Sequence, residues 1–149
     1  MEELDIDDIE RNWAVDSKID LTNLNENSSR IVELHSKYHK ALNAAKRALR
    51  VFEADKKRMI LWRTDYYMNN LPKDFLDEKG WKVRKERPVL KTELDRYLDA
   101  DELIIDLNLS IGECNDIITY CESIIKTINN KPFIIKNIID NKKFENGGY

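Results

Sequence analysis

A chain of 149 residues, of which 42% are hydrophobic and 36% are charged, suits one domain or one compact protomer of an assembly. It contains only four glycines and three prolines, which disfavours a sheet-rich fold with many turns and favours helices. No run of about 18 apolar residues occurs, so a helix that crosses a membrane is excluded.

The net charge of −3 combines segments of opposite sign. Residues 1–36 contain ten acidic and three basic residues, a balance of −7. Residues 37–63 contain nine basic and two acidic residues, a balance of +7, and a second basic run extends from Lys79 to Lys91. An acidic chain as a whole would not be expected to bind nucleic acid, but a concentrated basic segment is typical of a surface that binds phosphate groups.

The N-terminal segment, residues 1–25, is acidic and poorly periodic, and we expect a short helix around Asp5–Trp13 followed by a loop. Its first letters, MEELDIDDIERNW, lack the basic and then apolar order of a signal peptide. A reducing cytoplasm is therefore the expected compartment. There, Cys114 and Cys121 fit one buried helix face better than a disulfide or a metal site.

Residues 26–68 are predicted to form one long helix that begins near Ser28 and ends near Tyr67. The helix contains no glycine or proline, and its apolar residues keep helical spacing at Ile31, Leu34, Tyr38, Leu42, Ala45, Leu49, Phe52 and Ile60. Five basic residues fall on roughly the opposite arc: Lys40, Arg47, Arg50, Lys57 and Arg58. The helix is therefore expected to be apolar on one side and strongly cationic on the other.

Residues 69–97 are predicted to be an irregular linker, with room for a short extended piece at Trp81–Lys85. The helical pattern is interrupted at four positions: Asn69, Asn70, Pro72 and Gly80. The linker is also basic around its tryptophan, with Lys79, Lys82, Arg84, Lys85 and Arg87. It therefore repeats the combination of cations and an aromatic ring.

Residues 98–149 are predicted to hold a second long helix, from about Asp99 to Asn130, and a shorter last helix that begins near Pro132. Apolar residues of the second helix alternate spacings of three and four at Ile104, Leu107, Ile111, Cys114, Ile118, Cys121, Ile125 and Ile128. Ile117 and Ile124 widen this stripe. Such a repeat indicates a coiled-coil seam or a bundle face. The expected fold class is all-α, with two long helices, a shorter C-terminal helix and a basic linker.

The C-terminal apolar stripes leave two alternatives open, an intramolecular core and a surface for self-association. Part of each stripe must serve the core, but the apolar positions on two faces of residues 103–139 exceed what one partner helix would cover. We therefore expect a helical homo-oligomer. Its expected contact residues are Ile118, Cys121, Ile125, Phe133, Ile135, Ile138 and Phe144.

Three stretches of the sequence are distinctive in combination. They are SKYHKALNAAKRALRVFEADKK (Ser36–Lys57), RTDYY (Arg63–Tyr67) and FIIKNIIDNKKFENG (Phe133–Gly147). A cysteine lies twelve residues before Phe133, at Cys121, and a further set comprises Leu98, Ala100 and Asp101. In this order and spacing, which covers most of the chain from about Asp16, they resemble the UvsY recombination mediators of T-even-type bacteriophages.

That resemblance implies a recombination mediator, not an enzyme, in the cytoplasm of the infected bacterial host. Such proteins form ring-like homo-oligomers, of about six or seven subunits. They bind single-stranded DNA without sequence preference and help the phage recombinase replace the phage single-strand-binding protein. The family's DNA-binding motif has a lysine two residues before its arginine; Arg63 matches the arginine, but Leu61 stands where the lysine is expected.

Single-strand binding requires cations along the path of the backbone and flat rings on which bases stack. Lys56, Lys57 and Arg58 lie less than two turns before Arg63 and supply charge that Leu61 does not. Charge runs on helices are more often solvated faces, and aromatic residues are more often core. Taken with the resemblance, the expected DNA-binding residues are Lys40, Arg47, Arg50, Lys56, Lys57, Arg58, Arg63 and Tyr66.

Other classes of protein fit these features less well. An oligomeric helical scaffold or adaptor, which would not bind DNA, would use the basic helix to contact an acidic protein. A basic amphipathic helix on a membrane surface is weaker, because the apolar arc is needed for packing. An enzyme is not expected: there is no glycine-rich phosphate loop, and His35 and His39 lack a third metal ligand. We therefore expect no catalytic residue, no metal and no cofactor.

Overall fold

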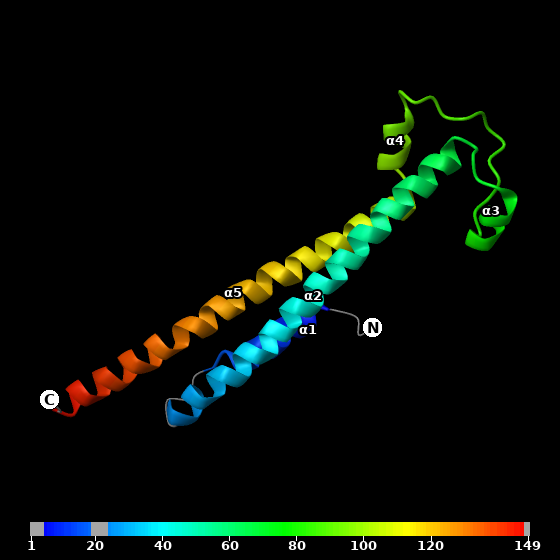
Figure 1. Cartoon of the computed structure of the whole chain (residues 1–149). Helices are drawn as coiled ribbons and strands as arrows, with labels where there is room; N and C mark the ends of the chain where they lie inside the picture. The colour runs from blue at the N-terminus through cyan, green and yellow to red at the C-terminus, as the bar shows by residue number, and fades with distance from the viewer. Residues whose placement is uncertain (1–4, 19–23, 148–149) are drawn as a thin grey trace. The chain divides into compact units, whose positions relative to one another are not determined.

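The computed structural model describes residues 5–18 and 24–147, with side chains from Ser29 onward in the second range. Within these ranges it contains five helices: α1 (Ile6–Asp16), α2 (Leu24–Tyr67), α3 (Lys73–Lys79), α4 (Leu94–Asp99) and α5 (Glu102–Glu145). The described residues contain no strand, and the predicted all-α fold with two long helices is confirmed (Figure 1). The chain divides into a first unit, residues 1–47 and 113–149, and a second unit, residues 48–112.

The short helix expected near the N-terminus is confirmed as α1. Asp5 caps it, because its side chain accepts a hydrogen bond from the backbone N–H of Asp7 at 2.9 Å. Asp7 and Asp8 in the first turn also interact favourably with the positive end of the helix dipole. The helix extends beyond the predicted Trp13, to Asp16.

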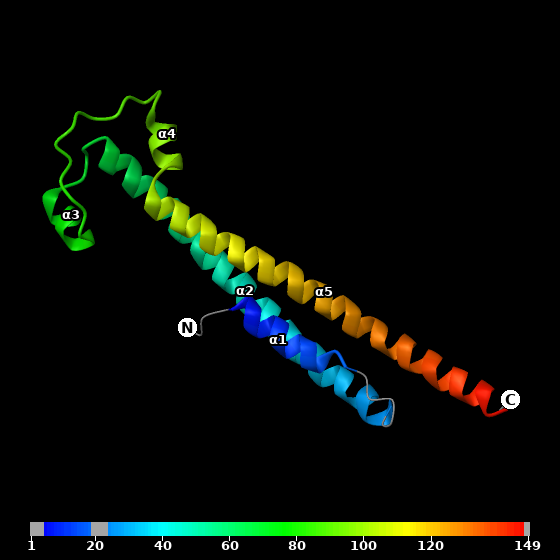
Figure 2. The same ribbon diagram turned by 180° about the vertical axis from the view of Figure 1, so that it is seen from behind.

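In the first unit, α1 and the N-terminal part of α2 pack with the C-terminal part of α5 (Figures 1 and 2). One buried cluster comprises Leu34, Tyr38, Ile124 and Ile128. The next comprises Leu42, Ala45, Ile117 and Cys121. Since residues later in α2 meet residues earlier in α5, the two helices run antiparallel here. Ile9 of α1 packs against both clusters, and the Trp13 ring lies edge-on to Tyr38 with centroids 5.3 Å apart.

The buried face of α5 in this unit confirms the predicted seam but shifts its members. Its buried residues alternate spacings of three and four: Cys114, Ile117, Cys121, Ile124, Ile128, Lys131 and Ile135. Ile117 and Ile124 are each 2% exposed, whereas the neighbouring Ile118 and Ile125 are only partly buried. Adjacent isoleucines make both registers equally apolar, so the packing against α2, and not the periodicity, selects one.

The two cysteines lie on this seam, as predicted. Both are free thiols, and Cys121 is fully buried. Burial raises the pKa of both thiols, and the neighbouring charges of Glu113 and Glu122 raise it further. They therefore act as small apolar core residues in the reduced state.

The prediction that the second long helix ends before Pro132 is wrong. α5 is one helix of 44 residues that contains Pro132. Proline removes one backbone hydrogen bond inside a helix and crowds the carbonyl four residues earlier, at a cost of about 3 kcal/mol. The seam continues through the proline, with Ile128 and Lys131 buried before it and Ile135 after it. We attribute the unbroken helix to this packing on both sides, since tertiary burial supplies most helical stability in proteins.

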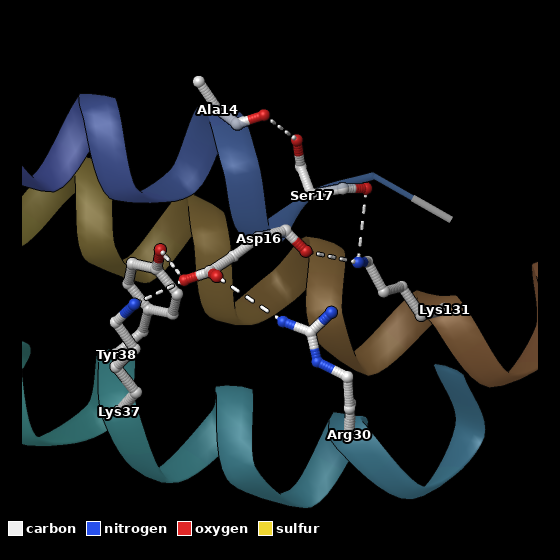
Figure 3. Close-up of polar contacts among 7 residues, drawn as sticks. All are labelled: Ala14, Asp16, Ser17, Arg30, Lys37, Tyr38 and Lys131. Carbon is white, nitrogen blue, oxygen red and sulfur yellow. Dashed lines mark hydrogen bonds and ion pairs between the residues drawn. The ribbon is translucent and has the colours of Figure 1, made fainter. Parts of the chain in front are cut away.

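Asp16, which the sequence placed in a loop, anchors the end of α1 to α2 (Figure 3). Its Oδ2 accepts hydrogen bonds from Lys37 Nζ at 2.6 Å and from the Tyr38 hydroxyl at 2.9 Å, and Arg30 lies 3.6 Å from Oδ1. Burial by itself raises the pKa of the Asp16 carboxyl. The hydrogen bonds from Lys37 and Tyr38 and the charges of Lys37 and Arg30 outweigh burial and hold that pKa below its usual value.

Lys131 occupies a seam position that would ordinarily be apolar, and it ties α5 to the same point of α1. It is 6% exposed, and its Nζ donates to the backbone carbonyls of Asp16 and Ser17, each at 3.3 Å (Figure 3). α1 has no basic residue in its own last turn, so Lys131 supplies the cation that the carbonyl end of the helix favours. Burial, and then the charge of Arg30, lowers the pKa of Lys131.

Replacing Asp16 with alanine is expected to lower the free energy of unfolding by about 1–3 kcal/mol, because the buried Tyr38 hydroxyl loses its acceptor. The measurement is chemical denaturation at one fixed protein concentration. Glu10→Ala is the matched control, since Glu10 is exposed in the middle of α1 and its loss should change stability by less than about 0.5 kcal/mol. Equal effects of the two substitutions would contradict the anchoring role.

The second unit contains two helices where the sequence predicted an irregular linker, and no strand forms at Trp81–Lys85. Pro72 precedes α3, and Gly80 ends it in the left-handed conformation at φ 70°, with the Trp81 N–H bonded to the Leu76 carbonyl at 2.9 Å. The residues that indicated a break therefore mark the start and stop of α3. The six-residue α4 follows later in the segment, at Leu94–Asp99.

Candidate nucleic-acid interface

Four aromatic side chains of the second unit, the aromatic cluster, come together from the end of α2, from α3 and from the residue after Gly80. They are Trp62, Tyr66, Phe75 and Trp81. Phe75 lies edge-on to Trp62, with centroids 5.7 Å apart, and edge-on to Trp81 at 5.8 Å. Tyr66 also lies edge-on to Trp81, with ring centroids 5.8 Å apart. All four are half-buried, so the cluster retains exposed ring surface.

The segment after Gly80 is held to the end of α2 by hydrogen bonds between side chains and backbone. The Tyr66 hydroxyl donates to the Lys82 carbonyl at 2.7 Å, and the Arg84 guanidinium donates to the Tyr67 carbonyl. The Val89 N–H donates to the same Tyr67 carbonyl at 3.0 Å. The two combinations of cations and aromatic rings, which the sequence placed in separate regions, therefore form a single site.

Basic residues contact the aromatic cluster or lie close to its members in the chain. Lys79 Nζ lies 4.3 Å from the Trp62 ring centroid, a cation–π contact. Four further cations of this unit, on α2 and beside Trp81, are exposed: Lys57, Arg58, Lys82 and Lys85. Partly exposed rings near exposed cations are the groups that single-stranded nucleic acid requires.

Arg63, unlike these exposed cations, is nearly buried and forms an ion pair with Asp101. Its Nε lies 2.7 Å from Asp101 Oδ2; the Arg63 side chain is 13% exposed and that of Asp101 is 1% exposed. The Tyr67 hydroxyl donates to the same oxygen at 2.5 Å. The other oxygen, Oδ1, accepts from the backbone N–H groups of Leu103 at 3.0 Å and Ile104 at 3.3 Å, so Asp101 also caps α5.

The electrostatics of Asp101 follow from these contacts. Burial raises the pKa of its carboxyl, but the hydrogen bonds from Tyr67 and Arg63 and the charge of Arg63 outweigh burial, and the pKa lies below its usual value. For Tyr67, burial and then the bond to Asp101 raise the pKa of the hydroxyl. Asp101 is therefore an anion and Tyr67 a neutral donor at neutral pH.

The predicted DNA-binding residues fall into three groups. Arg50, Lys57 and Arg58 are exposed on α2 in the second unit. Lys40 and Arg47 are also exposed, on the part of α2 that belongs to the first unit. The remaining three are half-buried or nearly buried: Lys56, Arg63 and Tyr66.

Sequence reasoning missed Asp101 as the partner of Arg63, and Phe75 as a member of the aromatic cluster. Asp101 was one of the residues that carry the family resemblance, but no function was assigned to it. A usable signal was its position three residues before Ile104, the first apolar residue of the helical repeat, since an aspartate just before such a repeat is typical of a cap. No local signal identified the ion pair, since its partners lie 38 residues apart.

The predicted oligomerisation residues also divide into groups. Cys121 and Ile135 are buried in the core of the first unit, at 0% and 3% exposure. Phe133 and Phe144 are exposed at 68% and 84%. The other three are half-buried: Ile118, Ile125 and Ile138.

The part of the chain that the structure describes lacks two other kinds of feature. No group of three or more histidine, cysteine or acidic side chains is arranged there to hold a metal ion. Within residues 5–18 and 24–147, no helix is both long enough and apolar enough to cross a membrane.

Known proteins similar to this chain belong to one family of recombination proteins. The family described as "Recombination, repair and ssDNA binding protein UvsY" matches residues 12–148. The recombination protein uvsY of Enterobacteria phage T4 is 25% identical over 142 residues, which are 95% of this chain and 98% of that protein.

Solved structures give the same result. A crystal structure of the bacteriophage T4 recombination mediator protein UvsY (lattice type II) is similar with a TM-score of 0.79 and 25% identity, and covers 96% of this chain and 98% of that one. A second crystal form, lattice type I, gives a TM-score of 0.76 at 25% identity over 93% and 98% of the two chains. The family consists of recombination mediators, which are not enzymes. With a family match over nearly its whole length, the chain belongs to the UvsY family of recombination, repair and single-stranded DNA-binding proteins.

Proposed function

We propose that this protein binds single-stranded DNA as a homo-oligomer and helps a phage recombinase replace the single-strand-binding protein on the strand. The aromatic cluster and the exposed cations around it are the observation that supports this proposal. Bases would stack on the exposed ring faces, and phosphates would pair with the cations. Neither contact distinguishes one base from another, which suits a mediator that acts on any sequence.

The phosphate contacts in this proposal come first from the exposed cations. Lys57 and Arg58 lie one turn before Trp62 on α2, and Lys82 adjoins Trp81. Arg50 lies two turns before Lys57, on the same side of the helix. Lys40 and Arg47 are further exposed cations, on the part of α2 that belongs to the first unit. Lys56 and Tyr66 are assigned a smaller share, since each is half-buried.

Self-association is part of the proposal, because one protomer offers few phosphate contacts. Apolar residues near the C-terminal end of α5 are exposed, with Phe133 at 68%, Ile134 at 43% and Phe144 at 84%. They and the half-buried Ile118, Ile125 and Ile138 form the proposed contact surface between copies. In a ring of about six or seven subunits, each strand would meet many weak sites, which act at high effective concentration.

A salt titration of binding to fluorescent oligo-dT tests the proposed function. Each phosphate that a cation neutralises contributes about −0.7 to the slope of log affinity against log salt concentration, so we expect a slope of several units. Leu61→Lys is the matched variant: Leu61 is 60% exposed, one turn after Lys57, and a lysine there should steepen the slope by at least about 0.7.

Three results of these measurements would contradict the proposed function or a part of it. A slope near zero would contradict binding through the cations. Failure to bind oligo-dT at near-physiological salt, in a protein that remains oligomeric, would favour the helical scaffold that contacts an acidic protein. An unchanged slope for Leu61→Lys would show that the strand does not follow the exposed face of α2.

A further inference from the structure

Arg63 has the sequence position of a DNA contact but the surroundings of a structural residue. Its guanidinium lies 4.2 Å from the Tyr66 ring centroid, 4.7 Å from that of Trp81 and 5.2 Å from that of Tyr67. It also pairs with Asp101 at 2.7 Å. The charge of Arg63 therefore lies next to a buried carboxylate and within cation–π distance of three aromatic rings.

We propose that Arg63 is a positioning residue of the single-strand site: it holds Tyr66 and Trp81 in place through its pair with Asp101, while exposed cations contact the phosphates. The inference rests on the proposed function, because it assigns a role within that same site. The sequence predicts that Arg63 contacts DNA, whereas in this inference Arg63 makes no contact with the strand.

The energetics of the ion pair support this assignment. For Arg63 to reach a phosphate it would have to leave Asp101, whose side chain is 1% exposed. That departure would leave a buried carboxylate without a cation, which is strongly unfavourable. A phosphate brought close to the pair would in addition be repelled by the carboxylate. The exposed side chains of Lys57 and Lys82 meet neither obstacle. Arg58 pairs with Asp55, but the Asp55 side chain is 41% exposed, so water can solvate that carboxylate if Arg58 leaves it.

The same contacts explain how the aromatic cluster is assembled. Trp81 belongs to a segment without regular structure, and it meets α2 through Tyr66 and the Arg63 guanidinium. Asp101 fixes the guanidinium, and Asp101 is itself fixed as the cap of α5 by the N–H groups of Leu103 and Ile104. The start of α5 therefore helps to hold the Trp81 ring in place, together with the contacts of Trp81 to α3.

Arg63→Gln separates the two roles when it is compared with Lys82→Gln, a surface cation of the same site. If Arg63 positions the rings, Arg63→Gln weakens oligo-dT binding by at least about fivefold, the lower limit for losing one base stack, and leaves the salt slope unchanged. Lys82→Gln should instead reduce the slope by at least about 0.7. A reduction of that size for Arg63→Gln, with ring positions unaltered, would overturn the proposal.

Tryptophan emission of the DNA-free protein gives a second readout. In a Trp13→Phe background the signal comes from Trp62 and Trp81 alone. Arg63→Gln should shift this emission to longer wavelength, because Trp81 loses a contact and gains water, whereas Lys82→Gln should leave it unchanged. This readout does not require DNA binding. If the wild-type protein fails to bind oligo-dT, the proposed function fails, and the emission still decides whether Arg63 positions Trp81.

The double variant Arg63→Gln/Asp101→Asn keeps the test valid if the single variant does not fold. Asn caps helices as well as Asp does, and an amide pair leaves no buried charge. A positioning role predicts that the double variant recovers emission and affinity toward wild-type values, with the wild-type salt slope. A double variant whose slope is lower by about 0.7 or more, as expected after the loss of a phosphate contact, would overturn the inference.

Discussion

Replacing Asp101 with alanine is expected to lower the free energy of unfolding by about 3–5 kcal/mol, the range for breaking a buried ion pair by removal of one partner. Three groups lose their acceptor together: the Arg63 guanidinium, the Tyr67 hydroxyl and the first N–H groups of α5. Arg63 would then carry an unpaired charge at 13% exposure. Chemical denaturation at a fixed protein concentration measures the effect, since stability of an oligomer depends on concentration.

Asp99→Ala is the control for this prediction, since Asp99 is exposed on the neighbouring α4, and its loss should change stability by less than about 0.5 kcal/mol. The effect of Asp101→Ala should also depend on pH. Because folding lowers the pKa of Asp101 from 3.8, its stabilisation is complete above that value and is lost as the pH falls through the folded-state pKa. The difference between wild type and variant should therefore shrink below pH 3.8. A difference that is independent of pH would contradict the role of the charge.

Neutralising three exposed cations around the aromatic cluster should have the largest effect on function. In the variant Lys57→Gln/Arg58→Gln/Lys82→Gln, each protomer on the strand loses three proposed phosphate contacts, which reduces the salt slope by about 2 for every protomer that contacts the strand. If the two titration lines meet near 1 M salt, affinity at 0.1 M falls by at least about 100-fold. Fluorescence anisotropy with oligo-dT across salt concentrations measures both quantities.

The control for this variant makes the same change of net charge in the first unit, at Lys126, Lys136 and Lys143, which are exposed on α5. Substitution of these three by glutamine should leave the slope near its wild-type value. Equal losses from the two triple variants would mean that net charge alone governs binding, and the site around the aromatic cluster would then be wrong. Sedimentation of both variants checks that the oligomer is retained.

Much of the fold was predictable because it depends on local pattern. The apolar residues of α2 and α5 recur at helical spacing, and glycine and proline are scarce between Leu24 and Tyr67. The exposed arc of Arg50, Lys57 and Arg58 follows from the same periodicity. Two errors arose where a local signal has two meanings: Pro72 and Gly80 delimit α3 although they were interpreted as breaks, and Pro132 lies within α5 although prolines usually end helices.

The candidate site was predicted in its components and not in its assembly. Tyr66, Trp81 and the basic residues near each were recognisable, because single-strand binding requires these residue types. These residues come together in the folded protein through the hydrogen bond from the Tyr66 hydroxyl to the Lys82 carbonyl and the contact between the Tyr66 and Trp81 rings. The inward direction of Arg63 required Asp101, and helical periodicity carries no information about a partner on another helix.

By itself, the sequence determined a helical protein with a cationic face and an apolar seam, since helix propensity, periodicity and charge are properties of neighbouring residues. Only the tertiary structure decided that Ile117 and Ile124, and not Ile118 and Ile125, lie deepest in the seam, and that Asp16 anchors α1. It also decided that Arg63 faces a buried carboxylate. These outcomes depend on burial and on ion pairs between residues far apart in the chain, whose energies arise only when the helices pack.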